Sequence, residues 1–400
     1  MAVLGLVCEY NPFHRGHAWH LQHSRERLGG DALAVCVMTG DFVQRGEAAV
    51  FSKYARAEAA CRCGADLVVE LPLPWCLSSA EGFSRGAVTL LSALGADVLS
   101  FGAETEDLTP LRKLADCLCD ESVQQEIRTR MASEETLSYA QIRQKLMAER
   151  LGEPTAQLLR QPNCILAVEY LKTIRQEGLD LEPMAILRRG CGHDSADGED
   201  GCLSASAIRE KLRRGEPITG AVPEHALQVY ERELVLGCTP GAERAETALL
   251  ARLRMLDSAA FEALPDAGEG MGRRLYKAVY AETSLASILD ASSASRYTNA
   301  RLRRAVLCAC LGVDRHWSAG KPPYARILAM NERGQAHLAS LREREGLPIV
   351  IKPASVRRLP EPCEALFRLG AEAHDLYTLC CADWRDHAPG EDWRRGPFRL

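Results

Sequence analysis

Apolar and polar positions alternate in blocks along the first part of the chain. Four short, almost uninterrupted apolar runs read VLGLV at 3–7, LAVCVM at 33–38, DLVVELP at 66–72 and VLSFGA at 98–103. Between them lie stretches with helical spacing that end near glycines, such as KYARAEAACRCG at 53–64. Buried strands that alternate with helices are typical of a parallel sheet covered by helices. We therefore predict an α/β fold, with one further strand in PMAILRR at 183–189.

The pattern changes beyond this region. Residues 108–160 are polar, rich in Glu and Gln and helical in spacing, and we interpret them as a helical insertion. From residue 205 to about 345 the pattern is again helical, and IVIKPA at 349–354 predicts a short extended piece. We expect two domains: a Rossmann-like α/β domain over residues 1–215, with its insertion, and a mostly α-helical domain over residues 216–400.

Composition favours a globular protein without a membrane segment. Hydrophobic residues make up 46% and charged residues 26% of the 400 positions, and no run approaches the roughly 18 apolar residues of a spanning helix. The start, MAVLGLVCEYNPF, has no basic leader or cleavage site, so we expect a cytoplasmic protein. Of the 16 cysteines, several such as Cys8 and Cys36 lie in apolar runs, and no C-x-x-C pair occurs. We expect free thiols and no zinc site.

Charge is distributed unevenly along the chain. The net charge is −5 overall, but residues 1–300 carry −10 and residues 301–400 carry +5. A basic last quarter on an acidic body is either a footprint for a polyanion or a chance fluctuation of the surface. Within it, RYTNARLRR places Arg301 and Arg304 one helical turn apart, and we consider both as candidate RNA contacts; the alternative is that they brace the domain.

The turn NPFHRGH lies between the first predicted strand and the first predicted helix. Strand ends and helix N-termini are where parallel sheets bind phosphates, and imidazoles donate hydrogen bonds to phosphate oxygens. Gly16 lets the backbone approach closely, so we predict that His14 and His17 contact phosphate and act in catalysis. A metal site or a purely structural role are the alternatives. No acidic residue nearby completes a metal site, and we interpret His20 and His23 as surface or packing residues.

A second element of the same kind is CLSASAIREKL, at 202–212. Nucleotidylyl transferases pair an H-x-G-H turn with such a Ser-rich helix start. Ser206 is predicted to cap the helix and offer its hydroxyl, and Arg209 to meet phosphate as a planar fork. Taken alone, the element is equally an ordinary helix cap.

Polar residues also follow the second strand, in DFVQRGEAAVFSKYAR at 41–56. Arg45 or Lys53 is a candidate to hold a small anion, and Asp41 to orient a histidine or a magnesium-bound water. The alternative is a solvated loop and a helix start.

With these motifs in order, the chain resembles the bacterial tRNA(Met) cytidine acetate ligase family over nearly its whole length. The matching segments are GLVCEYNPFHRGHAWHL, MTGDFVQRGEAAVFSKYARAEAA, GADLVVELP, SAEGFSRGAV, FGAET, PNCILAVEYL, HD followed by SASAIR, RYTNARLRRA and PYARILAMNERGQAHL. The resemblance implies that ATP and acetate form acetyl-adenylate and pyrophosphate. The acetyl group then passes to the wobble cytidine of elongator tRNA(Met), forming N(4)-acetylcytidine. We also expect magnesium, bound through the phosphates of ATP.

The resemblance further implies an ATP site, carried over residue by residue. Gly102, Asn163 and one of Arg188 and Arg189 match family positions, and Arg15 stands where relatives have asparagine. The first segment of the site comprises Val7, Cys8, Glu9, Tyr10, Asn11, Pro12, Phe13, His14, Arg15, Gly16, His17, Ala18, Trp19 and His20. Two other functions remain open: a small-molecule adenylyltransferase of the same fold that makes a dinucleotide-type cofactor, and a non-catalytic RNA-binding protein.

Overall fold

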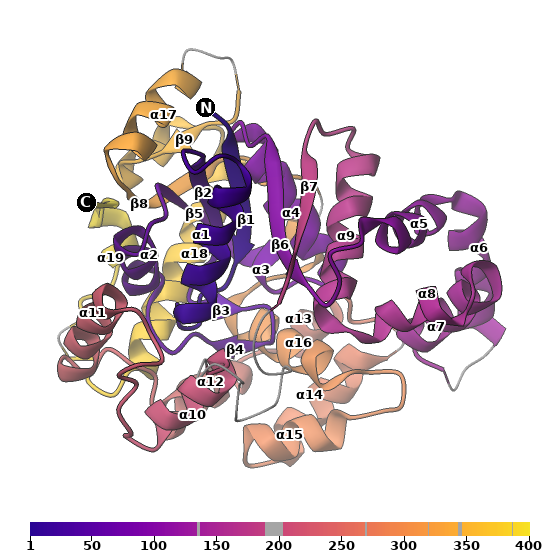
Figure 1. Cartoon of the computed structure of the whole chain (residues 1–400). Helices are drawn as coiled ribbons and strands as arrows, with labels where there is room; N and C mark the ends of the chain where they lie inside the picture. Colours follow the sequence, from indigo (N-terminus) through magenta and orange to yellow (C-terminus); the bar gives the residue numbers. More distant parts are fainter. Residues whose placement is uncertain (134–136, 189–202, 269, 319, 343–345, 386) are drawn as a thin grey trace.

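The computed structural model describes the chain except for residues 134–136, 189–202, 269, 319, 343–345 and 386 (Figure 1). At its centre is a mostly parallel sheet in the order β10-β8-β5-β2-β1-β6-β7. All five strands predicted from the apolar runs are present and parallel to their neighbours among these five. They are β1 (Val3–Cys8), β2 (Leu33–Thr39), β5 (Leu67–Leu71), β6 (Val98–Ala103) and β7 (Glu182–Leu187). The predicted α/β fold is confirmed.

The last quarter of the chain adds strands to the same sheet. β8 (Ala325–Met330) is antiparallel to β5, while β9 (Ile349–Val350) and β10 (Phe398–Arg399) run parallel to β8. The prediction of helix throughout residues 205–345 is therefore wrong at β8, whose six residues are all buried. A short apolar run does not distinguish a buried strand from a buried helix. The sheet thus crosses the domain boundary expected at residue 215, and the extended piece expected at 349–354 begins in β9.

Helices cover both faces of the sheet. α1 (Arg15–Arg27) and α2 (Lys53–Arg62) lie on the face toward the viewer in Figure 1, and α4 (Ala80–Ala93) and α9 (Pro162–Gln176) on the opposite side. Alternate strand residues point to the two faces, so the buried apolar side chains form two clusters. Leu4 and Leu6 of β1 pack with α1 and α2, while Val3 packs with α4. The whole sheet is therefore covered, as continuous apolar strands require.

The predicted insertion is helical in its described residues. It comprises α5 (Leu108–Cys119), α6 (Glu121–Ser133), α7 (Tyr139–Leu151) and α8 (Glu153–Gln157), followed by a 3-10 turn at Leu158–Arg160, and extends to one side of the sheet (Figure 1).

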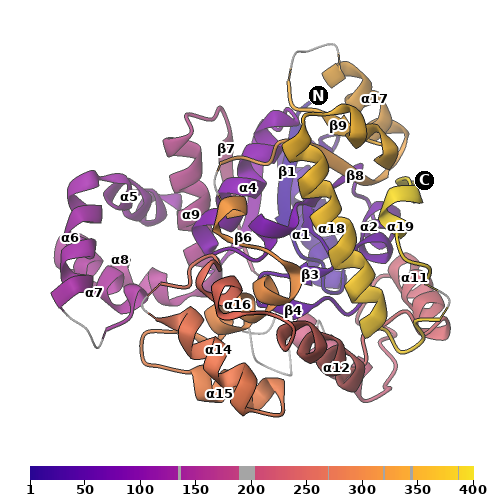
Figure 2. The same cartoon turned by 180° about the vertical axis from the view of Figure 1, so that it is seen from behind.

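The chain after β7 is largely helical and wraps around the sheet. In Figure 2, which is seen from behind, α18 (Glu361–Cys380) crosses in front of the sheet, and α14 (Met271–Ala281), α15 (Leu285–Ser292) and α16 (Asn299–Leu311) are grouped below it. Shorter elements are α3 (Leu73–Cys76), a hairpin of β3 (Phe42–Val43) and β4 (Glu47–Ala48), and 3-10 turns at Arg315–Ser318 and Pro353–Arg358. The helices are α10 (Ala205–Arg213), α11 (Glu224–Val235), α12 (Ala242–Leu253), α13 (Ser258–Glu262), α14 (Met271–Ala281), α15 (Leu285–Ser292), α16 (Asn299–Leu311), α17 (Glu332–Arg342), α18 (Glu361–Cys380) and α19 (Glu391–Arg394).

Buried charges join the two ends of the chain. The Lys53 ammonium donates to Glu70 (2.9 Å) and to Asp392 (2.6 Å), and Arg326 of β8 donates to the same two carboxylates. Because a buried charge is costly without a partner, this cluster holds α19 and β8 against the start of α2. No helix in the described residues is long and apolar enough to cross a membrane.

Candidate functional site

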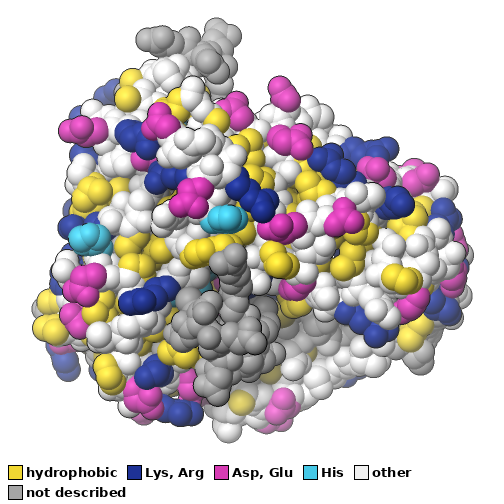
Figure 3. Space-filling view, viewed as in Figure 1, with side chains coloured by type: hydrophobic (Ala, Val, Ile, Leu, Met, Phe, Trp, Pro, Cys, Tyr) yellow, Lys and Arg dark blue, Asp and Glu magenta, His cyan; other side chains and the backbone are white. Residues whose placement is uncertain are grey.

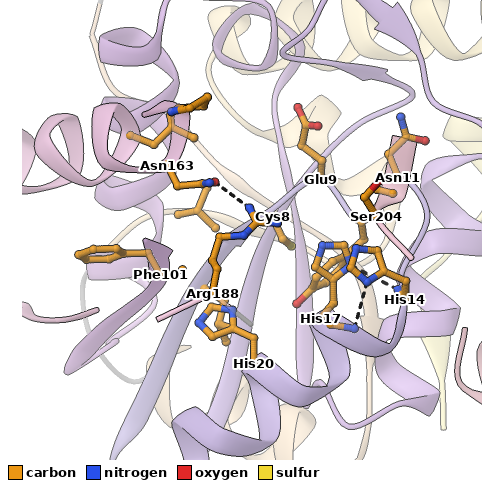
Figure 4. A pocket seen from close by; sticks show the side chains of 18 of the residues that line it. Cys8, Glu9, Asn11, His14, His17, His20, Phe101, Asn163, Arg188 and Ser204 are labelled. Atoms are coloured by element: carbon orange, nitrogen blue, oxygen red, sulfur yellow. Dashed lines mark hydrogen bonds between the residues drawn. The ribbon is translucent and has the colours of Figure 1, made fainter. Parts of the chain in front are cut away.

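A cavity of about 470 Å³ opens at the carboxyl ends of β1, β6 and β7. The turn before α1, the start of α9 and the start of α10 contribute its walls (Figure 4). This is the edge at which parallel α/β sheets bind their ligands. Of the first predicted ATP-binding segment, the cavity is lined by Val7, Cys8, Glu9, Tyr10, Asn11, His14, Gly16, His17, Trp19 and His20. Pro12, Phe13, Arg15 and Ala18 are not among the lining residues.

His14 and His17 cap the helix that they introduce. His14 is the N-cap of α1, and its Nδ1 accepts a hydrogen bond from the Gly16 N–H (3.0 Å). The His17 Nδ1 in turn accepts from the His14 N–H (3.3 Å), so the two side chains form a reciprocal capping box (Figure 4). Two of the N–H groups at this helix start are thereby satisfied.

The capping bonds determine which ring nitrogen carries the proton. Burial, reinforced by the Arg188 and Arg209 cations, lowers the pKa of His14 to about 4. Burial and the neighbouring His14 lower the pKa of His17 well below its usual value. Both rings are therefore neutral near pH 7, and because each Nδ1 accepts a hydrogen bond, the proton is on Nε2. Each ring then has one N–H left to donate, the arrangement expected of a phosphate or oxyanion site.

Gly16 is suited to this turn for a steric reason. A Cβ placed on it would lie 2.9 Å from His14 Cε1, so a side chain would push the capping imidazole away.

The second motif also reaches the cavity, with one correction. Ser204, not Ser206, is the N-cap of α10, since its hydroxyl accepts from the Ala207 N–H (3.2 Å). Ser206 lies in the first turn and accepts from Arg209 (3.3 Å), and both side chains line the cavity. Arg209 also donates to the Asn11 carbonyl (2.8 Å), which joins the start of α10 to the H-x-G-H turn.

Arg188 and Asn163 form the opposite wall. The Arg188 guanidinium donates to Asn163 Oδ1 (2.9 Å), as Figure 4 shows. Gly102 lies directly against this arginine. A Cβ on Gly102 would be 3.1 Å from Arg188 Cγ, so a side chain there would crowd the arginine. Of the two arginines suggested by the sequence, Arg188 thus lines the cavity, and Arg189 lies outside the described residues.

Sequence reasoning did not single out Glu104. Its two carboxylate oxygens accept from Asn163 Nδ2 (2.7 Å) and from the Cys164 backbone N–H (3.0 Å). Glu104 therefore holds the start of α9 and fixes the orientation of the Asn163 amide. The position of Glu104 directly after β6 could have indicated its role, because polar residues at the ends of such strands often belong to functional sites.

Two further candidates, His20 and Lys53, lie elsewhere than expected, whereas His23 lies where it was expected. His20 is a cavity residue whose Nε2 lies 2.9 Å from the Ser100 hydroxyl, so the interpretation as surface or packing is wrong for His20. His23 stacks on Trp19 at the molecular surface, with ring centroids 4.8 Å apart. Lys53 is 1% exposed and bound to carboxylates, so it does not reach the cavity and the anion-binding prediction fails for it.

Asp41 orients a histidine, as one alternative predicted. It accepts from Nδ1 of the buried His374 (2.8 Å), whose Nε2 faces Glu391 (3.2 Å). Burial would lower the pKa of His374, but the carboxylates of Asp41 and Asp392 outweigh it and raise the pKa to about 10. This imidazolium belongs to the buried cluster that also holds Lys53.

Gln44 and Arg45, in the loop between β3 and β4, line the cavity. Arg56, fully buried below them, donates to the carbonyls of Glu9 (2.5 Å) and Gly40, and so ties together the ends of β1 and β2. Within the described residues no cluster of three or more His, Cys, Asp or Glu side chains suits a metal ion. The described cysteines are free thiols.

Known proteins with similar sequences and structures agree on one family. A family model described as HIGH Nucleotidyl Transferase matches residues 1–391. A tRNA(Met) cytidine acetate ligase of Syntrophotalea carbinolica is 38% identical, with 100% of this chain and 99% of that protein covered. One of a Thermoanaerobacter species is 31% identical over 95% of each chain.

Solved structures give the same result. The apo crystal structure of Thermotoga maritima TmcAL is 29% identical and superimposes with a TM-score of 0.93 over 100% of both chains. The structure of the same protein bound with alpha-thio ATP is 30% identical, with a TM-score of 0.91 over 100% of both chains.

Proposed function

Because the chain belongs to the HIGH nucleotidyl transferase family and, within it, to the tRNA(Met) cytidine acetate ligases, we propose that it performs the family reaction in two steps. First, acetate attacks the α-phosphorus of ATP to give acetyl-adenylate and pyrophosphate. The acetyl group then passes to the exocyclic amine of the wobble cytidine in elongator tRNA(Met).

The observation that carries this proposal is the reciprocal capping of His14 and His17. It leaves two neutral Nε2–H donors, with ring centroids 3.8 Å apart, in the walls of one cavity. During the first step negative charge builds up on the oxygens that bridge and surround the α-phosphorus. Donors held in advance stabilise that charge without reorganisation at the moment of reaction.

Cations stand on both sides of the histidine pair. Arg209 approaches from α10 and Arg188 from the end of β7, and both lower the pKa of His14 through their charge. We assign Arg209 and Ser206 to the phosphates, and Arg188, Asn163 and Gly102 to the rest of the nucleotide. Magnesium enters with ATP, held by its phosphates, since this cavity offers Glu9 as its single carboxylate among the described lining residues.

The second step requires a surface for tRNA, and α16 is the proposed contact. Arg301 is half-buried and donates a hydrogen bond from Nη2 to the Asp266 carbonyl (2.7 Å), whereas Arg303 is exposed. On the face drawn in Figure 3, acidic and basic side chains of the described residues intermingle, so this face shows no broad basic surface.

The experiment that tests the function is incubation of the protein with ATP, isotope-labelled acetate and total bacterial tRNA, followed by nucleoside analysis. We expect labelled N(4)-acetylcytidine, together with AMP and pyrophosphate in equal amounts. Pyrophosphate release that requires a small nucleotide or its precursor in place of acetate would favour the adenylyltransferase alternative. Absence of any pyrophosphate release would contradict both enzymatic functions.

A further inference from the structure

The acceptor amine in the second step is a weak nucleophile. Its lone pair is delocalised into the pyrimidine ring. Attack on the acetyl carbon makes this nitrogen cationic, so one of its two protons must be lost as the C–N bond forms. A base in contact with the amine speeds such a step by about 10²- to 10⁴-fold. The cavity should therefore contain a group with a free lone pair and no proton at neutral pH.

His14 and His17 do not meet this requirement. The Nδ1 atoms of His14 and His17 accept backbone N–H groups, and their Nε2 atoms carry the protons. The Nε2 of His20 is engaged with the Ser100 hydroxyl. Glu9 provides the single carboxylate among the described lining residues, and a carboxylate has lone pairs on both oxygens.

Glu9 is held in place by a hydrogen bond to one of its two carboxylate oxygens. It follows the last residue of β1, and its Oε1 accepts from the Gln44 N–H (2.9 Å). No described residue hydrogen-bonds Oε2. Figure 4 shows Glu9 among the side chains around the cavity, on the same strand end as the H-x-G-H turn.

We propose that Glu9 is the general base of acetyl transfer, an inference that rests on the ligase function proposed above. The cytidine N4 attacks the carbonyl carbon of acetyl-adenylate and a C–N bond forms. The N4 proton passes to Glu9 Oε2. The C–O bond to AMP then breaks, the electron pair stays on the phosphate oxygen, and Glu9 later returns its proton to water.

The surroundings of Glu9 suit this role. Burial raises the pKa of Glu9, against the opposing effects of the Gln44 N–H and of nearby arginine charges, and a carboxylate of raised pKa is a stronger base. The charged and titratable groups around it come from five elements or loops: Arg45, Arg56, Arg209, Tyr170 and Cys76.

The test compares two acceptors of the same acetyl-adenylate. Hydroxylamine is a strong nucleophile that needs no protein base, whereas the tRNA amine does. In single-turnover reactions we expect Glu9→Gln to lower acetylation of tRNA about 10²-fold or more, and acetohydroxamate formation far less. Glu9→Asp should recover part of the tRNA reaction. The wild-type transfer rate should rise with pH up to a plateau as Glu9 loses its proton. The transfer rate of Glu9→Gln should not show this rise with pH.

Glu106→Gln is the matched control, because it removes a carboxylate at the same edge of the sheet outside the cavity lining. An equal loss with both acceptors in Glu9→Gln would overturn the proposal and assign Glu9 to activation. A wild-type protein that yields neither acetohydroxamate nor acetylated tRNA would instead contradict the ligase function itself.

Discussion

The imidazole rings of His14 and His17 stack with their centroids 3.8 Å apart, and the His17 ring caps the backbone of His14. The two side chains therefore act as a unit, in which each one fixes the position of the other. Their shared role gives the turn both a structural and a chemical function, and the two can be separated by the choice of substitution.

We expect His14→Ala or His17→Ala to lower acetyl-adenylate formation about 10²-fold or more, the loss typical of one oxyanion donor. Because the rings are in contact, the double variant should lose less than the product of the single losses. Acetate-dependent pyrophosphate release measures the effect. Near-normal release in both single variants would contradict the assignment.

His14→Asn separates the two functions of the N-cap. Asparagine is a favourable N-cap, so its side-chain oxygen replaces Nδ1 as the acceptor for the Gly16 N–H, but it does not place a donor where Nε2 lies. Thermal unfolding should stay close to wild type while pyrophosphate release falls as in His14→Ala. Full activity in His14→Asn would indicate that capping alone is required.

The buried His374 makes stability depend on pH. Its pKa is about 10 in the fold and near 6.5 in an unfolded chain, so between these values the native state holds an extra proton. This stabilisation is fully present below pH 6.5 and is lost as the pH rises toward 10, by at most about 1.4 kcal/mol per pH unit. Urea unfolding from pH 6 to 9.5 should show a steeper decline for wild type than for His374→Gln. Parallel curves would show that His374 is neutral.

Glu104 supports nucleotide binding through Asn163. In Glu104→Gln, one of the two hydrogen bonds to Asn163 and Cys164 is lost or reversed, and the amide no longer has a fixed orientation toward Arg188. A hydrogen bond to a charged group contributes about 1.5–3 kcal/mol, so ATP binding should weaken by roughly 10-fold or more. The KM for ATP should rise more than kcat falls, whereas Glu106→Gln should leave both near wild type. An unchanged KM would contradict this coupling.

The sequence predicted the elements whose signal is local. The apolar strands β1, β2, β5 and β6 are continuous, and His14, Gly16 and His17 lie within one turn, so their joint role follows from spacing. Contacts between distant segments leave no such signal. Lys53 pairs with Asp392, 339 positions away, and this pairing removes it from the site. The apolar run that forms β8 lies among helical stretches, and periodicity alone does not distinguish a buried strand from a segment of buried helix.

The last prediction concerns α16, which contacts the loop between β3 and β4 although the two segments are far apart in the sequence. Arg304 does not share an open face with Arg301: its Nη1 donates to the Gln44 carbonyl (3.3 Å), and the N–H of Gln44 holds Glu9. A Cβ on Gly46 would lie 2.6 Å from Arg303 Cβ, so the helix rests directly on this loop. We therefore expect Arg304→Met to reduce acetyl transfer through the loop, with little change in the salt dependence of tRNA binding.

The double variant Arg301→Glu and Arg303→Glu should behave in the opposite way. It reverses the charges of the half-buried Arg301 and the exposed Arg303, so tRNA binding should weaken. The slope of log K against log salt should become shallower, because fewer phosphate contacts form and fewer counterions are released on binding. Acetate-dependent pyrophosphate release should fall less than tRNA binding does. Filter binding at two salt concentrations, beside pyrophosphate release, distinguishes the two variants. If Arg304→Met alone lowers the salt slope, Arg304 contacts tRNA directly and its bond to Gln44 is secondary.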